Sequence, residues 1–156
     1  MLPTLNLPAL EARVTRGAGG RLSIYDEQRR RYVTLTAEEW VRQHFVSYLI
    51  RTLGYPAALI GNEVTLDIQG VKRRSDTVVY SPLDGHPLMV IEYKAPQVAI
   101  TQAVFGQIQS YNTVLRADYL VVSNGMRHFC CRNDYAAMKA TFLQEIPRWE
   151  QINPKH

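Results

Sequence analysis

The spacing of apolar and polar positions predicts alternating helices and strands from residue 36 onward. Thr36, with Glu39 three residues later, is typical of a helix N-terminus, and Gly54 marks the end of that helix near residue 53. Three strands, a second helix capped by Thr101 and a further strand are expected next, at 63–68, 72–80, 87–94, 101–116 and 118–123. This order predicts an α/β fold, in which a mixed sheet has a helix on each face.

The segments that flank this core carry shorter strand patterns. Residues 11–34 alternate around a glycine-rich turn, which predicts an antiparallel hairpin followed by one more short strand. Strand 127–132 follows a turn, an edge strand is expected over 137–143, and the tail after Pro147 is expected to be loose. We therefore expect one domain with an N-terminal hairpin extension, a core, and an edge strand with a tail, at 1–35, 36–132 and 133–156.

Length and composition limit the class of protein. The chain has 156 residues, of which 46% are hydrophobic and 21% are charged, as expected for a single globular domain. It has no apolar run long enough to span a membrane and no secretory signal pattern at its start, so we expect a cytoplasmic protein. Adjacent Cys130 and Cys131 lack the spacing of a zinc site, and no Walker motif indicates ATP use.

The charge of the chain is moderately basic and comes mainly from arginine. The net charge is +4, and 14 of the 18 basic residues are arginines, whose forked guanidinium groups suit phosphate. Two clusters stand out, formed by Arg29, Arg30 and Arg31 and by Lys72, Arg73 and Arg74. They are either phosphate-binding groups or the solvated ends of strands.

The strand expected over 87–94 ends in the sequence Glu92-Tyr93-Lys94. Because side chains alternate along a strand, Glu92 and Lys94 share one face and Tyr93 lies on the other. Charged groups on an apolar strand either pair with each other or bind a ligand. A hairpin turn at 82–85 would place Asp76 beside Glu92, and two adjacent carboxylates suit Mg²⁺ or Mn²⁺. The alternatives are an ion pair within the strand and a surface carboxylate at Asp76.

Each expected helix adds polar groups near these strands. On a helical wheel Glu38 lies within the core-facing stripe, close to Arg42, whereas Glu39 lies at the edge of the stripe. Glu38 is either a third metal ligand or water-orienting base, or an acid favoured by the helix dipole and paired with Arg42. In the second helix Gln107 and Tyr111 are four residues apart, which places an amide beside a phenol, although a surface glutamine and a core tyrosine have the same spacing.

The order of these residues resembles the PD-(D/E)xK nuclease superfamily. The set Asp76, Glu92-Tyr93-Lys94 and Gln107-x-x-x-Tyr111 is most similar to the N-terminal nuclease domain of type I restriction enzyme R subunits, over about residues 36–132. The resemblance implies a restriction-endonuclease-like mixed sheet. Ser75 stands where the family has a proline that is not a ligand. An R subunit continues into a helicase motor where this chain ends, so translocation is not expected.

The resemblance also implies a function, a Mg²⁺-dependent endonuclease that hydrolyses phosphodiester bonds in DNA, with Mn²⁺ as an alternative ion. Lys94 would stabilise the attacking hydroxide or the charge on the phosphate, and Gln107 and Tyr111 would orient the phosphate or Lys94. The groups implied as metal ligands are Asp76, Glu92, the backbone carbonyl of Tyr93 and, in the outer shell, Glu38.

The partners expected from this resemblance are DNA, subunits of a restriction or repair system, and a second copy of the chain. The DNA backbone would contact two arginine clusters, Arg73 and Arg74 in one and Arg29, Arg30 and Arg31 in the other. The alternative from a different functional class is a catalytically silent DNA-binding or subunit-docking module of such a complex.

Overall fold

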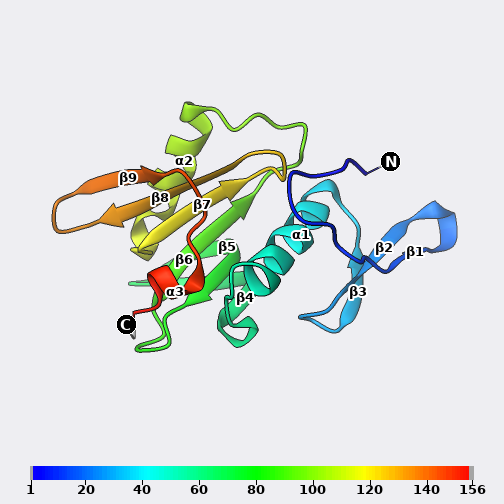
Figure 1. Cartoon of the computed structure of the whole chain (residues 1–156), viewed down its shortest axis with the longest axis horizontal. Coiled ribbons are helices and arrows are strands. Elements are labelled where there is room, and N and C mark those ends of the chain that lie inside the picture. Colours follow the sequence, from blue (N-terminus) through cyan, green and yellow to red (C-terminus); the bar gives the residue numbers. More distant parts are fainter. Residues whose placement is uncertain (1, 155–156) are drawn as a thin grey trace.

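A six-stranded mixed sheet forms the centre of the molecule (Figure 1). The computed structural model describes residues 2–154, apart from the side chain of Ile68. Neighbouring strands of the sheet are antiparallel except for β6 and β7, which are parallel, as the helical crossover between them predicts. In spatial order the strands are β4 (Ile60–Ile68), β5 (Val71–Tyr80), β6 (Pro87–Tyr93), β7 (Tyr119–Ser123), β8 (His128–Asp134) and β9 (Lys139–Leu143).

The two long helices cover opposite faces of this sheet. Helix α1 (Ala37–Arg51) packs on the face that carries Val79, Met89 and Val121, and α2 (Gln102–Asn112) packs on the face that carries their neighbours in sequence. The predicted caps are present, because the side chains of Thr36 and Thr101 accept hydrogen bonds from backbone N–H groups three residues later. The 3₁₀ turn η3 (Thr113–Leu115) extends α2. The element order and the mixed sheet confirm the predicted order of core elements and the fold class.

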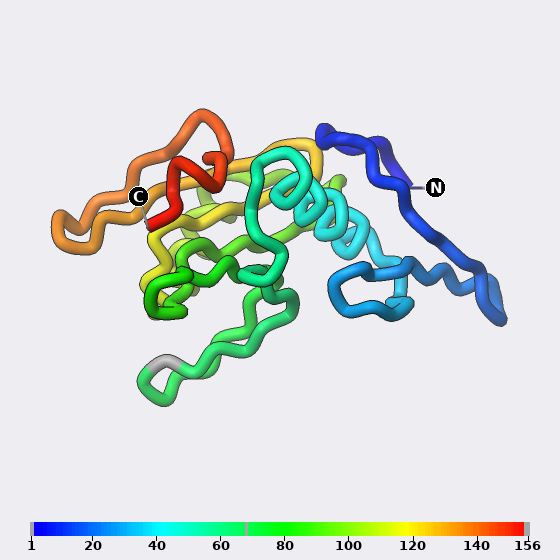
Figure 2. Tube along the Cα trace, turned by 60° about the horizontal axis from the view of Figure 1, so that its bottom comes forward, coloured from blue at the N-terminus to red at the C-terminus, as the bar shows by residue number. Residues whose placement is uncertain are grey.

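The N-terminal strands form a separate antiparallel sheet that projects from the body (Figures 1 and 2). Its strands are β1 (Val14–Arg16), β2 (Leu22–Asp26) and β3 (Arg31–Thr34), with the 3₁₀ turn η1 (Ala18–Gly20) between the first two. The predicted hairpin and additional short strand are therefore confirmed.

The C-terminal segment is ordered through residue 154, and the prediction of a loose segment after Pro147 is wrong for residues 148–154, whereas residues 155–156 lie outside the described part of the chain. Helix α3 (Trp149–Ile152) lies near the end of α1, which the 3₁₀ turn η2 (Ala57–Leu59) follows in the chain. The Trp149 N–H donates to the Leu53 carbonyl at 2.9 Å, and the Tyr55 hydroxyl donates to the Pro147 carbonyl at 2.8 Å. Ile152 is buried in the same apolar cluster as Leu53, so apolar burial holds this segment in place.

None of the helices in residues 2–154 is both long enough and apolar enough to cross a membrane.

Candidate active site

Strands β5 and β6 bring the two predicted carboxylates together. The pairing of Thr77 with Ile91 places Asp76 and Glu92 at the next position along the two strands. The Oδ2 atom of Asp76 accepts a hydrogen bond of 2.9 Å from the backbone N–H of Tyr93. The hairpin expected from the sequence therefore forms, and it fixes the Asp76 carboxylate against the strand that carries Glu92.

A surface cavity of about 540 Å³ opens over this pair of strands. Its walls come from the N-terminus of α1, the middle of β5, the C-terminal end of β6, and one side of α2. Arg74, which was predicted to bind DNA, also lines it. The cavity brings together every residue predicted for catalysis or metal binding: Glu38, Asp76, Glu92, Tyr93, Lys94, Gln107 and Tyr111.

One carboxylate oxygen in this cavity lacks a hydrogen bond. The Oε1 atom of Glu92 is buried and has no hydrogen-bond partner in the described part of the chain. Burial and the neighbouring charge of Asp76 raise the pKa of Glu92 to about 9, although Lys94 acts in the opposite direction. At neutral pH and without a cation, Glu92 therefore holds a proton.

A hydrogen-bond chain supports strands β5 and β6. The buried Tyr93 hydroxyl donates to Thr77 Oγ1 at 2.9 Å, and the Thr77 hydroxyl donates to Asn62 Oδ1 at 2.8 Å. The Asn62 amide in turn donates to Gln28 Oε1, which belongs to the turn between β2 and β3. Sequence reasoning missed this hydrogen-bond chain, because it joins four segments, β6, β5, β4 and the turn between β2 and β3, and no local motif indicates it.

Glu38 and Glu39 have the opposite environments to those expected from the helical wheel. Glu38 is exposed at the rim of the cavity, whereas Glu39 is buried and binds Arg42. Glu38 lies in the first turn of α1, before the first buried apolar residue, Val41, so the apolar stripe does not reach it. Among residues 2–154 no three His, Cys, Asp or Glu side chains come close enough to hold a metal ion, so Glu38 borders the cavity without completing a third acidic ligand.

Helix α2 presents Gln107 and Tyr111 to the cavity from its exposed side. A core tyrosine was one alternative for Tyr111, but 46% of its surface is exposed. The guanidinium group of Arg73 lies over its ring, 4.0 Å from the ring centroid. The predicted neighbour Gln107 is also exposed, so both side chains are open to a ligand.

The three arginines of the first cluster do not share one role. Arg29 forms ion pairs with Asp26, with Glu63 at 2.9 Å and with Glu39 at 3.5 Å, and its side chain is only 19% exposed. The charge of Arg29 is therefore paired inside the protein, and its contact with DNA stays a prediction. Arg30 and Arg31 are exposed.

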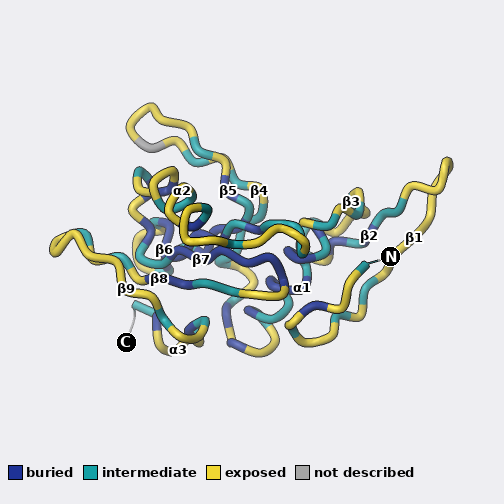
Figure 3. The backbone as a smooth tube through the Cα atoms, turned by 90° about the horizontal axis from the view of Figure 1, so that it is seen from above, coloured by how far each residue is buried: buried dark blue, intermediate teal, exposed yellow. Residues whose placement is uncertain are grey.

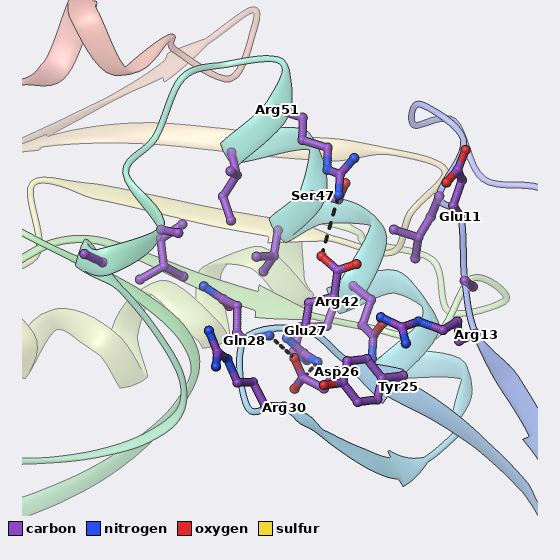
Figure 4. A pocket seen from close by; sticks show the side chains of 18 residues that line it. Glu11, Arg13, Tyr25, Asp26, Glu27, Gln28, Arg30, Arg42, Ser47 and Arg51 are labelled. Carbon is purple, nitrogen blue, oxygen red and sulfur yellow. Dashed lines mark hydrogen bonds and ion pairs between the residues drawn. The ribbon is translucent and has the colours of Figure 1, made fainter.

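A second cavity, of about 500 Å³, lies between the N-terminal sheet and α1 (Figure 4). Asp26 lies in its wall, where Arg42 contacts it at 2.9 Å. Burial opposes ionisation of Asp26, but the hydrogen bond from Arg29 and the charge of Arg42 lower its pKa. The buried acid in this cavity is thus fully paired, which is the arrangement of a structural ion network.

Comparison with known proteins gives two findings and one negative result. Residues 37–147 match the family described as type I restriction enzyme R protein N terminus. Among solved structures, the chain is similar to a fragment described as an HsdR subunit of a type I restriction enzyme from Vibrio vulnificus YJ016, at 20% identity and a TM-score of 0.53. That match covers 76% of this chain and 24% of the other, so it supports the fold alone. No match was found among curated proteins.

Proposed function

We propose a function from one premise: the chain belongs to the family of type I restriction enzyme R protein N termini. On this premise it is a metal-dependent nuclease of the PD-(D/E)xK type, which hydrolyses phosphodiester bonds in DNA. The observation that carries this proposal is the convergence of Asp76, Glu92 and Lys94 with Gln107 and Tyr111 on one open cavity.

The carboxylates of this cavity fit a divalent cation. Glu92 Oε1 is buried without a hydrogen-bond partner among residues 2–154, and burial and the adjacent Asp76 make ionisation of Glu92 unfavourable until a positive charge arrives. An all-oxygen donor set suits Mg²⁺ or Mn²⁺, which Asp76, Glu92 and the backbone carbonyl of Tyr93 would hold, with Glu38 near its outer shell. When bound, the ion supplies Lewis acidity at the phosphate and lowers the pKa of the attacking water.

The protein's own residues would orient the substrate and stabilise charge. Asp76 is held in place by the Tyr93 N–H, so its position does not depend on the substrate. Lys94 lies in the same cavity, where its ammonium group would stabilise negative charge that develops on the phosphate oxygens. Gln107 and Tyr111 would contact the phosphate group from the opposite wall, and they leave room for a water molecule between the walls.

Cleavage of supercoiled plasmid DNA in Mg²⁺, in Mn²⁺ and in EDTA tests the proposal. Glu92→Gln and Lys94→Ala should each reduce the rate by roughly 10²- to 10³-fold, as expected when one group that stabilises transition-state charge is removed. The matched controls are Glu145→Gln and Lys139→Ala, which change exposed residues outside the cavity and should leave the rate unchanged.

The outcome that contradicts the proposal is cleavage that persists at the wild-type rate in Glu92→Gln and Lys94→Ala. If no cleavage occurs in either ion and Asp76→Asn does not change Mn²⁺ binding, the chain is instead a DNA-binding or subunit-docking module of a restriction or repair complex. Calorimetry with Mn²⁺ alone measures this binding in the wild type and in Asp76→Asn.

A further inference from the structure

The N-terminal segment carries most of the excess positive charge of the chain. Residues 1–35 contain six arginines and three acidic residues, which is +3 of the net charge of +4. Two of the three acids already form ion pairs, because Asp26 binds Arg29 and Arg42, and Glu27 contacts Arg51 at 3.6 Å. The sheet β1–β3 therefore presents basic charge that its own acids do not neutralise.

Five of these six arginines are exposed on the projecting sheet. Arg13 lies over the ring of Tyr25 at 4.4 Å, and Arg16 donates one hydrogen bond to the Gly20 carbonyl. Within residues 2–154 none of the five forms an ion pair, and the five are Arg13, Arg16, Arg21, Arg30 and Arg31. Unpaired guanidinium groups on one projection provide a concentrated positive potential.

The turn between β2 and β3 is held rigidly at its base. Asp26 Oδ1 accepts hydrogen bonds from the backbone N–H groups of Gln28 at 3.0 Å and Arg29 at 3.4 Å. Its other oxygen binds Arg42 of α1 at 2.9 Å, which ties the turn to the body. Arg30 adopts a left-handed backbone with φ of 54°, and it leads into exposed Arg31. The buried network thus fixes the position of a turn that displays two free arginines.

The projecting sheet is linked to the candidate active site through Glu63. The Glu63 carboxylate contacts Arg29 at 2.9 Å on one side and Arg74 at 3.6 Å on the other, and Arg74 lines the catalytic cavity. In Figure 3 the hairpin β4–β5 projects toward the upper left and the sheet β1–β3 toward the right, so Glu63 contacts only the base of the sheet. A polyanion that runs from the cavity past Arg74 and Glu63 would therefore reach the base of the basic sheet.

We propose that the sheet β1–β3 is a nucleic-acid-binding arm, which holds the sugar-phosphate backbone of the substrate beside the catalytic cavity. This deepens the proposed nuclease function and rests on it for the identity of the polyanion. Arginine forks bind phosphate oxygens, and Tyr32, which is 47% exposed on the sheet, provides a ring for contact with sugars. Binding by such an arm depends strongly on salt and weakly on sequence.

Fluorescence anisotropy with the full chain and a labelled DNA duplex in EDTA tests the arm without cleavage. Arg30→Gln/Arg31→Gln and Arg16→Gln/Arg21→Gln should each weaken binding roughly tenfold or more at about 0.1 M salt, and should reduce the slope of log Kd against log salt by up to about 1.8. The matched control, Arg127→Gln/Arg132→Gln, makes the same charge change at exposed positions beyond the arm and should change Kd less than about twofold. Circular dichroism verifies that every variant is folded.

Three outcomes of the binding experiments would overturn the proposal of a nucleic-acid-binding arm. Arm variants that bind as tightly as the wild type, or control variants that lose as much affinity as arm variants, would each show that the arginines of the arm have no special role. A preference of the arm for phosphatidylserine vesicles over the duplex would assign it to a membrane surface.

A parallel cleavage assay separates the arm from the nuclease proposal. Arm-dependent binding without any cleavage in Mg²⁺ or Mn²⁺ leaves the arm in place and contradicts the nuclease. Cleavage by the arm variants at the wild-type kcat/KM contradicts the arm alone.

Discussion

Two regions of the molecule bury carboxylates close together, and they handle the negative charge in opposite ways. At the N-terminal sheet, Asp26 and Glu39 converge on Arg42, and Arg29 adds a second guanidinium group. In the cavity above β5 and β6, two carboxylates lie side by side, and Glu92 keeps a buried oxygen that has no hydrogen-bond partner in the described part of the chain. The first region is electrostatically complete, whereas the second needs a proton or a cation.

The pKa directions express the same difference. The arginines hold the pKa of Asp26 below its usual range in spite of burial, so its ionised form stabilises the fold. Burial and Asp76 raise the pKa of Glu92, so its ionised form destabilises the metal-free fold. Clusters that are complete serve structure, while an incomplete cluster of this kind marks a place where a ligand can bind.

Breaking the complete network should give the largest effect on stability. Arg42→Met leaves Asp26 and Glu39 buried without their main cation, so the free energy of unfolding should fall by about 3–5 kcal/mol. Urea denaturation at pH 7 measures it. The control Arg51→Met removes an arginine that is 69% exposed in its ion pair and should cost less than about 1 kcal/mol. Equal losses in the two variants would refute the distinction drawn for Arg42.

Replacing the acid of the incomplete cluster should change the free energy of unfolding in the opposite direction. Between pH 4.5 and about 9 the native state keeps a proton on Glu92 that the unfolded chain has lost, so rising pH destabilises the native state. Glu92→Gln removes this dependence and should stabilise the metal-free protein by about 1–4 kcal/mol at pH 8, and hardly at all at pH 5. Urea denaturation in EDTA at both pH values measures it, and an equal effect at the two values would contradict the assignment.

The contrast also separates what the sequence could and could not predict. The cavity was predictable because its geometry follows local rules: alternation places Glu92 and Lys94 on one face, and a tight hairpin brings Asp76 beside them. The ion network was not predictable, because Asp26 lies in the N-terminal sheet and Arg42 lies on α1, so no local pattern joins them. Residue spacing on α1 alone could not decide which glutamate Arg42 binds.

The fold shows the same division between local and distant determinants. The element order and both helix caps follow from short-range patterns, and the structure has them where they were expected. The tail was misjudged because its order comes from packing against α1, although the apolar spacing of Ile146, Trp149 and Ile152 was a signal for it. The exposure of Tyr111 was not predicted, because the Arg73 side chain that covers its ring comes from another element.

Cation binding should release the proton that the incomplete cluster holds. Because Glu92 must ionise when an ion binds, Mn²⁺ affinity should rise by up to about tenfold per pH unit between about pH 6 and pH 8. Calorimetry in buffers of different ionisation enthalpy counts the protons released. Glu145→Gln should retain the dependence and Glu92→Gln should lose it, and a pH-independent affinity in the wild type would refute the link.

The smallest expected effect concerns the hydrogen-bond chain that joins the two regions. Thr77→Val keeps the shape of the side chain but leaves the Tyr93 hydroxyl and Asn62 Oδ1 without their partner, which should cost about 1 kcal/mol of stability. Because the Tyr93 N–H holds Asp76, Mn²⁺ binding should also weaken severalfold, and hydrogen exchange at the Tyr93 amide should increase. Thr77→Ser restores the hydroxyl and should recover both. If Thr77→Val reduces global stability without changing Mn²⁺ affinity or the Tyr93 amide, the chain only supports the fold, and the N-terminal sheet has no influence on the carboxylates.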